Sequence, residues 1–145
     1  MKFMKKLKII KDNMLIEIVI FMIILLIFHE LSHMVFAVLN GGKIVGIGFN
    51  VFPFPFIYVK AINVKNLIGY YLAGPIFDLL ALFIIFFIIK YKPLKIAILI
   101  NLILNSNPFF SDWLLIKNYK WTLLWYIHFS IWGVLIIFLS KIILT

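Results

Sequence analysis

The stretch that organises this chain is His29-Glu30-Leu31-Ser32-His33, a pentapeptide inside the apolar run of residues 14–39. In a helix, residues i and i+4 lie on one face, one turn apart, so His29 and His33 can direct two imidazole nitrogens at one metal ion. Glu30 projects beside them. Two histidines at this spacing with an adjacent glutamate are typical of zinc hydrolases, in which the carboxylate takes a proton from zinc-bound water.

Histidines and acidic residues are rare in the rest of the chain, so their concentration in the pentapeptide is informative. The 145 residues contain three histidines and five acidic residues, and two of those histidines lie in the pentapeptide. An ionisable group at bilayer depth costs about 2.5–3.5 kcal/mol, so a cluster of them there indicates a functional site. The alternative is a packed helix whose histidines bond to neighbouring backbone or polar groups.

The composition predicts a single-domain membrane protein. The chain is 66% hydrophobic, and its apolar runs reach the roughly 20 residues that span a bilayer. It has no cysteine, so a metal would need His, Asp or Glu ligands. The net charge of +9 is carried by lysines near segment ends, which favours contact with lipid headgroups and excludes nucleic acid as a partner.

We therefore predict an all-α membrane protein with four transmembrane helices, a multi-pass protein of the cell membrane. The helices are expected over residues 13–39, 66–90, 94–117 and 120–144, the third broken at Pro108. Together, residues 13–145 would form one transmembrane domain. Residues 1–12 carry five lysines and predict a basic interfacial segment. A cleaved signal peptide is not expected, because no small-residue cleavage site follows.

Residues 43–64 differ in character from the apolar runs. They are rich in β-branched and aromatic residues, and Phe52-Pro53-Phe54-Pro55 divides them into two stretches. This pattern predicts a membrane-associated β-hairpin between the first and second helices. Open strand edges are not tolerated against lipid, so the hairpin should rest on protein or at the interface. The alternative is an apolar loop.

Three residues are candidates for a third zinc ligand: Asp78, Asp112 and His128. Glu17 is excluded because it lies about 18 Å along the same helix from His29. The first and third helices end on the same side of the bilayer, so Asp112 matches the depth of the histidines and is favoured. Asp78 lies in the middle of the second helix and is favoured as a partner that orients a histidine. His128 is expected to pack in the bundle with a hydrogen bond to a neighbour.

Three motifs in this order resemble the site-2 protease family of intramembrane zinc metalloproteases. They are the histidine pentapeptide, Ala73-Gly74-Pro75, and Asn105-Ser106-Asn107-Pro108-Phe109-Phe110-Ser111-Asp112. Residues 42–49 also look like that family's strand after the metal-binding helix, so the resemblance covers about residues 15–117. It implies that His29, His33 and Asp112 bind zinc. It also implies that Glu30 is the general base.

The resemblance further implies that Asn105 or Asn107 contacts a substrate, which would be a transmembrane segment or a membrane-bound peptide. Two positions depart from the family pattern. Trp113 stands where the family usually has Gly, and Asp78 stands where it usually has Asn. These departures favour an alternative, a non-proteolytic membrane protein that keeps the fold, such as an immunity or partner-binding protein. A metal transporter is disfavoured because its ligands would follow a path through the bundle.

Lysines predict an orientation that the resemblance opposes. Nine lysines fall on the N-terminal side of the predicted bundle and five on the other, which places the N-terminus in the cytoplasm and the metal toward the outer half. The family resemblance implies a site nearer the cytoplasm. The sequence does not indicate an oligomeric state or an individual substrate.

Overall fold

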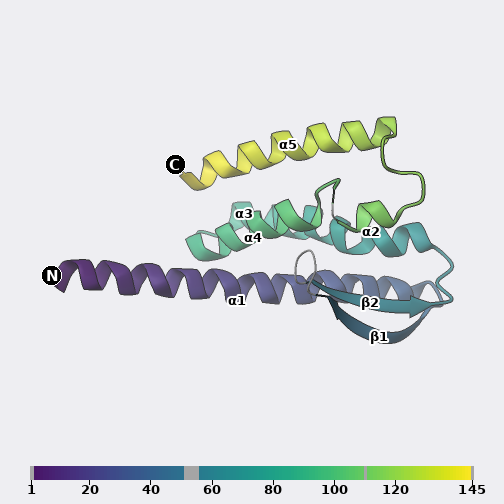
Figure 1. The fold of residues 1–145 in the computed structure, drawn as a ribbon, viewed down its shortest axis with the longest axis horizontal. Coiled ribbons are helices and arrows are strands. Elements are labelled where there is room, and N and C mark those ends of the chain that lie inside the picture. The colour runs from purple at the N-terminus through teal and green to yellow at the C-terminus, as the bar shows by residue number, and fades with distance from the viewer. Residues whose placement is uncertain (1, 51–55, 110, 145) are drawn as a thin grey trace.

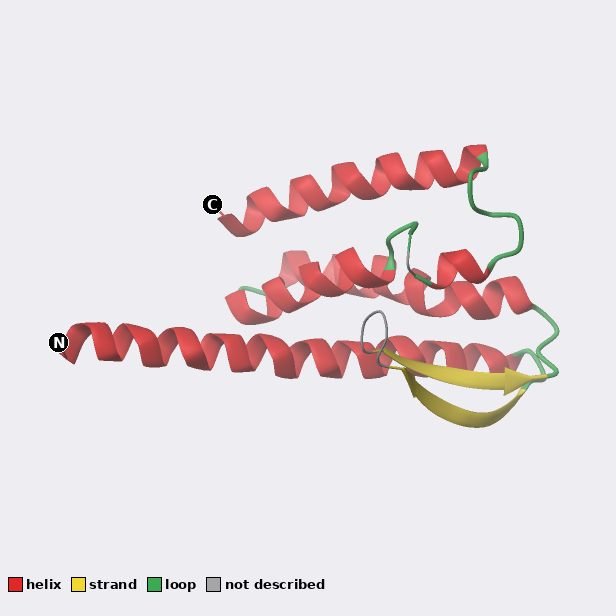
Figure 2. Cartoon of the chain, in the orientation of Figure 1, coloured by secondary structure: helices red, strands yellow, loops and turns green. Residues whose placement is uncertain are grey.

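The computed structural model describes residues 2–50, 56–109 and 111–144, which form a layered helical bundle with a small sheet on one side (Figure 1). Figure 2 shows the same chain by secondary structure. The elements in chain order are α1 (Lys2–Leu39), β1 (Lys43–Asn50), β2 (Phe56–Ile62), α2 (Leu67–Phe77), the π-helical turn η1 (Asp78–Leu82), α3 (Phe83–Ile88), α4 (Lys92–Asn105), the 3-10 turn η2 (Asp112–Leu115) and α5 (Leu123–Leu144).

Helix α1 is one unbroken helix of 38 residues. It begins at Lys2, so the basic segment predicted over residues 1–12 is continuous with the helix predicted over 13–39. Two glycines follow its last residue. Gly41 has φ +74°, in the left-handed region that glycine tolerates. Gly42 donates its N–H to the Ala37 carbonyl at 2.8 Å, and a Cβ there would lie 2.5 Å from Val64.

The predicted hairpin is present as two antiparallel strands. β1 and β2 pair with Ile47 opposite Val59, and the register shifts between Ile44 and Gly46. β2 lies beside α1, and β1 lies farther from the bundle (Figures 1 and 2). The proline-containing stretch predicted to separate the strands, Phe52-Pro53-Phe54-Pro55, lies outside the described residues. The hairpin therefore rests on protein through β2.

The helix predicted over residues 66–90 is present in three consecutive parts, α2, η1 and α3. The Asn66 side chain caps its start by accepting the Gly69 N–H at 2.9 Å. Pro75 lies inside α2, and the π-helical turn follows it at Asp78. Such turns are local irregularities that often coincide with functional sites. Here the turn carries Asp78 into the bundle, where it is fully buried.

The third predicted helix is shorter than expected. Helix α4 ends at Asn105, three residues before Pro108, because backbone ahead of a proline is disfavoured in the helical region. Its 14 residues extend about 21 Å, less than the roughly 30 Å hydrocarbon core of a bilayer. The segment predicted as one broken helix over 94–117 is therefore a helix, a turn and the separate element η2.

Three helices in the described part of the chain are long and apolar enough to cross a membrane, rather than the four predicted. They are Asn13–Leu39, Leu67–Ile88 and Leu123–Ile142. In the most apolar stretch of 18 residues in each helix, only 17, 28 and 11%, respectively, is buried. Apolar side chains exposed on this scale are unusual for a soluble domain. The described structure is thus compatible with a membrane protein.

The apolar core lies between α1, α3, α4 and α5. Phe86, Ile98, Leu102 and Leu139 are fully buried in it. α1 also packs along α2 and α4, so the face of α1 that carries the histidines is covered by these two helices. Both ends of the described chain lie at the end of the bundle away from the hairpin (Figure 1).

Candidate metal centre

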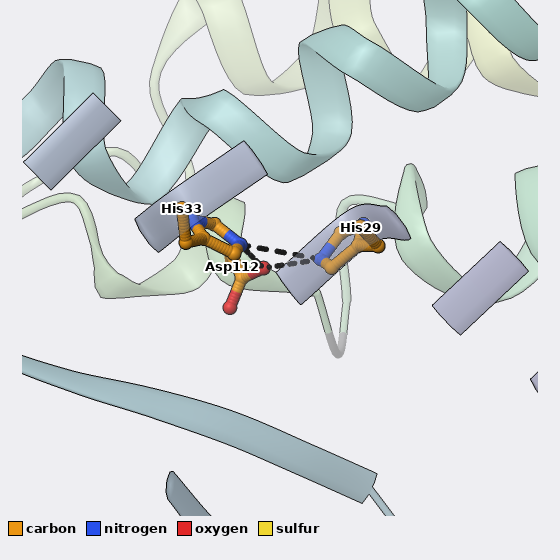
Figure 3. A group of neighbouring side chains, drawn as sticks. All are labelled: His29, His33 and Asp112. Carbon is orange, nitrogen blue, oxygen red and sulfur yellow. Dashed lines mark hydrogen bonds and ion pairs between the residues drawn. The ribbon is translucent and has the colours of Figure 1, made fainter. Parts of the chain in front are cut away.

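Two histidines of α1 and one aspartate of η2 converge at the centre of the bundle (Figure 3). The Nε2 atoms of His29 and His33 lie 3.3 Å apart. Asp112 Oδ2 lies 3.1 Å from each of them. Both histidines are almost fully buried, with 3 and 5% of their surface exposed. The structure thus brings together the three residues that the sequence predicts as metal ligands.

The other ring nitrogen of each histidine is already engaged. His33 Nδ1 lies 2.6 Å from the Tyr70 carbonyl oxygen, which can only accept a hydrogen bond, so Nδ1 carries the proton. His29 Nδ1 lies 2.8 Å from Asp78 Oδ2 and donates to this carboxylate in the same way. In its neutral form each imidazole then presents the lone pair of Nε2. The two Nε2 atoms and the carboxylate oxygen of Asp112 therefore face one another.

The spacing of these three atoms suits a small divalent cation. Tetrahedral ligands bound to zinc at about 2.0–2.1 Å lie about 3.3 Å from one another. The observed separations of 3.1 to 3.3 Å fall in this range. The same distances also suit hydrogen bonds and ion pairs if a histidine carries a second proton. The donor set, two imidazoles and a carboxylate with room for a fourth ligand, is that of a catalytic zinc site.

Asp78 connects the centre to α4. Its Oδ2 accepts hydrogen bonds from His29 Nδ1–H and, at 2.9 Å, from the side-chain amide of Asn105. The Asn105 amide also donates to Asn101 Oδ1 at 3.2 Å. Asp78 Oδ1 is buried and has no hydrogen-bond partner among the described residues. A carboxylate that holds a histidine by its second nitrogen is the usual support of a metal ligand. The contact between Asp78 and His29 is the one expected if Asp78 orients a histidine.

Glu30 lies beside the centre and is held by the sheet. Its Oε2 accepts the Val59 backbone N–H of β2 at 3.1 Å. The Val59 carbonyl in turn accepts the Tyr70 hydroxyl at 2.5 Å. Both backbone groups of Val59 therefore point at the helices and not at β1. The sheet is attached to the site through the predicted base.

A cavity opens beside these groups. Its volume is about 340 Å³, and Glu30, His33 and Asp112 form its polar wall. The remaining wall is apolar and aromatic, and it is formed by Ile57, Tyr58, Val59, Tyr70, Tyr71 and Leu115. A ligand in this cavity would therefore lie beside Glu30 and two of the three converging residues.

The predicted substrate contacts at Asn105 and Asn107 lie elsewhere. The Asn107 side chain is buried and bonds to backbone at the end of α4, with its Nδ2 3.1 Å from the Ile103 carbonyl and its Oδ1 accepting the Phe109 N–H at 2.9 Å. Asn105 contacts Asp78. Neither side chain is among the described residues that line the cavity. Their positions favour structural roles, because the end of a helix leaves backbone groups that these amides satisfy.

His128 lies on α5, outside the converging group. Its Nδ1 lies 2.6 Å from the Tyr119 hydroxyl, and its Nε2 lies 2.7 Å from the Ser106 carbonyl. Burial raises the pKa of the Tyr119 hydroxyl, so this group keeps its proton and donates. The hydrogen bonds are those expected of a histidine packed within the bundle.

A comparison of the chain with protein-family models finds no match, and comparisons with curated proteins and with solved structures find no significant match either.

Two further residues contact the histidines; Gly74 belongs to the Ala73-Gly74-Pro75 motif, whereas no motif in the sequence marks Tyr70. Tyr70 holds His33 through its carbonyl and β2 through its hydroxyl. Gly74 lies directly against the imidazoles, and a Cβ there would come within 2.5 Å of Nε2 of both His29 and His33. The spacing of four residues between Tyr70 and Gly74 places them on one helix face and was the available clue.

Replacing Gly74 with Ala should destabilise the packing of α2 on α1. The added methyl group meets buried rings, and overpacking of this kind costs about 1–3 kcal/mol. The matched control is Gly133→Ala in α5, where a Cβ has open space within 4 Å, and where Ala should be neutral or stabilising. Unfolding of each variant by sodium dodecyl sulfate, followed by circular dichroism, compares their stabilities. Equal stability of the two variants would show that Gly74 is not required for the close approach.

Proposed function

We propose that this protein is an intramembrane zinc metalloprotease that hydrolyses peptide bonds in or near transmembrane segments or membrane-bound peptides. The observation that carries the proposal is the convergence of two imidazole Nε2 atoms and a carboxylate oxygen within 3.3 Å of one another. Three acceptors facing each other in an apolar bundle need a cation or additional protons between them. A divalent metal ion satisfies all three, and the neighbouring Glu30 gives the site a base.

Zinc is the metal that fits this donor set best. Imidazole nitrogen and carboxylate oxygen in a site of three protein ligands are typical of catalytic zinc. His29, His33 and Asp112 would hold the ion, while Asp78 and the Tyr70 carbonyl fix the orientation of the two rings. When bound, zinc supplies a Lewis acid that polarises a carbonyl and makes water more acidic.

Glu30 is the residue that moves protons in this proposal. Its carboxylate lines the cavity together with His33 and Asp112, so it can take a proton from the attacking water and pass it to the leaving amine. In the structure the Val59 N–H donates to this carboxylate. Entry of a substrate along β2 would have to displace this contact, which would free Glu30 at the moment that a peptide is present.

The cavity suits an extended apolar peptide. Its wall combines residues 57–59 of β2 with aromatic and aliphatic residues of α2 and η2. A helical substrate hides its carbonyls in hydrogen bonds, so it must unwind before cleavage. An edge of the hairpin would offer the unwound segment backbone partners of the kind used in strand addition.

We further propose that the chain crosses the membrane four times and lies in the cell membrane. The crossing that is additional to the three long helices would be formed by α4 and η2, between Lys92 and Leu115. It would be the third crossing in chain order. Irregular backbone at membrane depth is tolerated where it is buried in protein or lines a cavity. Asp112 lies in this irregular part, and its contact with the histidines supports their common depth.

The alternative, a partner-binding protein that keeps the fold without cleaving peptides, also draws on one observation. The predicted base is engaged by the Val59 N–H, so the described state holds Glu30 in place. A protein of this kind would bind zinc and a partner but would not depend on Glu30 as a proton carrier.

Replacing Glu30 with Gln should separate these two functions. The amide cannot take a proton, and loss of a general base lowers rates by about 10²–10⁴-fold. We expect cleavage of a co-expressed membrane peptide to fall by at least this amount while bound zinc is retained. Glu17→Gln, at the only other glutamate, is the matched control and should cleave normally. Undiminished cleavage by Glu30→Gln would exclude the proposed base.

The number of crossings can be measured by labelling single cysteines in a chain that has none of its own. Lys43 follows α1, Lys92 begins α4 and Lys117 follows η2. Four crossings predict that cysteines at positions 43 and 117 react with an impermeant reagent from the same side, and that position 92 reacts from the other. If positions 92 and 117 react from the same side, the segment between them does not cross the membrane, and the chain crosses it three times. The side that labels position 43 also decides the orientation.

A further inference from the structure

The segment that carries Asp112 is irregular backbone between two helices. α4 ends at Asn105, and η2 begins at Asp112. The end of a helix leaves carbonyl groups without partners inside the helix. Within a bilayer each such group costs several kcal/mol unless another part of the protein satisfies it. The position of Asp112 therefore depends on what holds the carbonyls of this segment.

Helix α5 supplies side-chain donors to two of these carbonyls. His128 Nε2 lies 2.7 Å from the Ser106 carbonyl, and Trp125 Nε1 donates to the Pro108 carbonyl at 2.9 Å. A carbonyl can only accept, so His128 carries its proton on Nε2 and its Nδ1 accepts from the Tyr119 hydroxyl. Trp125 is almost fully buried, with 3% of its surface exposed. These contacts hold the segment from its N-terminal side.

The other side of Asp112 also rests on α5. The ring of Trp113, the next residue, lies 4.4 Å from the ring of His128, measured between centroids, at an angle of 52°. Trp113 also packs on Tyr119, with ring centroids 5.7 Å apart. His128 thus contacts the backbone before Asp112 and the side chain after it. Figure 1 shows α5 as a layer beside α4, on the side away from α1.

We propose that α5 positions the third ligand: His128 and Trp125 hold Ser106 and Pro108 at the end of α4, so that Asp112 meets the two histidines. This inference rests on the proposed zinc site and assigns His128 as a positioning residue that acts through Asp112. It also accounts for Trp113, whose ring gives the segment an anchor on His128 that glycine would lack.

The inference predicts a loss of zinc affinity when His128 loses its donor. In His128→Leu the Ser106 carbonyl is left unpaired and the segment can shift, so zinc affinity should fall about 10–100-fold, the range seen when supports of metal ligands are removed. His128→Gln places an amide N–H within reach of the same carbonyl and should restore most of the affinity. Ser130→Ala, on the same helix and with an exposed side chain, is the matched control and should bind zinc as the unchanged protein does.

Two readouts distinguish positioning from general damage to the fold. Purified protein is titrated with zinc against a chelator of known affinity, and with Co²⁺ to record the visible spectrum, which reports ligand type and geometry. The spectrum of His128→Leu should move toward that of Asp112→Ala, in which the third ligand is absent. If His128→Leu does not fold, Trp125→Phe serves instead, because it keeps an aromatic ring and removes only the donor to Pro108.

The outcomes separate this inference from the proposed function. Unchanged zinc affinity and Co²⁺ spectrum in a folded His128→Leu, or in Trp125→Phe where it is the variant measured, would overturn the positioning role and leave the zinc site intact. Failure of the unchanged protein to bind zinc would overturn the proposed function, and this inference would fall with it. Lower affinity in the Leu variant with rescue by Gln would support it.

Discussion

Three electron-rich atoms meet inside a bundle of apolar helices, and the remainder of the structure depends on how they are held there. Nε2 of His29, Nε2 of His33 and Oδ2 of Asp112 lie 3.1 to 3.3 Å from one another. In an environment of low polarity such groups repel unless a positive charge lies between them. The outer nitrogens of both rings are fixed by Asp78 and by the Tyr70 carbonyl, so the rings cannot turn away from this contact.

Three irregular features of the helices lie near this contact. Gly74 lets α2 approach the imidazoles, the π-helical turn carries Asp78 to His29, and the early end of α4 frees the segment that carries Asp112. Each would weaken a helix in isolation, because glycine, a π-turn and an unfinished helix end all reduce backbone stability. Local departures of this kind from regular helix are expected at a functional site.

The sequence predicts the convergence of His29, His33 and Asp112 better than it predicts their surroundings. Helical spacing places His29 and His33 on one face, and the alternation of helices brings Asp112 to their depth, so local periodicity and topology were sufficient. The end of α4 at Asn105 was not predicted, because Pro108 indicated a break but not how far ahead of it the helix ends. The contact between Val59 and Glu30 joins residues 29 positions apart, and no local pattern encodes such a contact. The roles of the predicted base and of a bound metal stay predictions.

The most direct test of the account is an anomalous-scattering measurement at the zinc edge on crystals of the purified protein. The account predicts one zinc ion per chain, bound to Nε2 of His29 and His33 and to a carboxylate oxygen of Asp112, at about 2.0–2.2 Å. Crystals grown with zinc that place no ion between these three residues, or that show Asp112 turned away from the histidines, would contradict it.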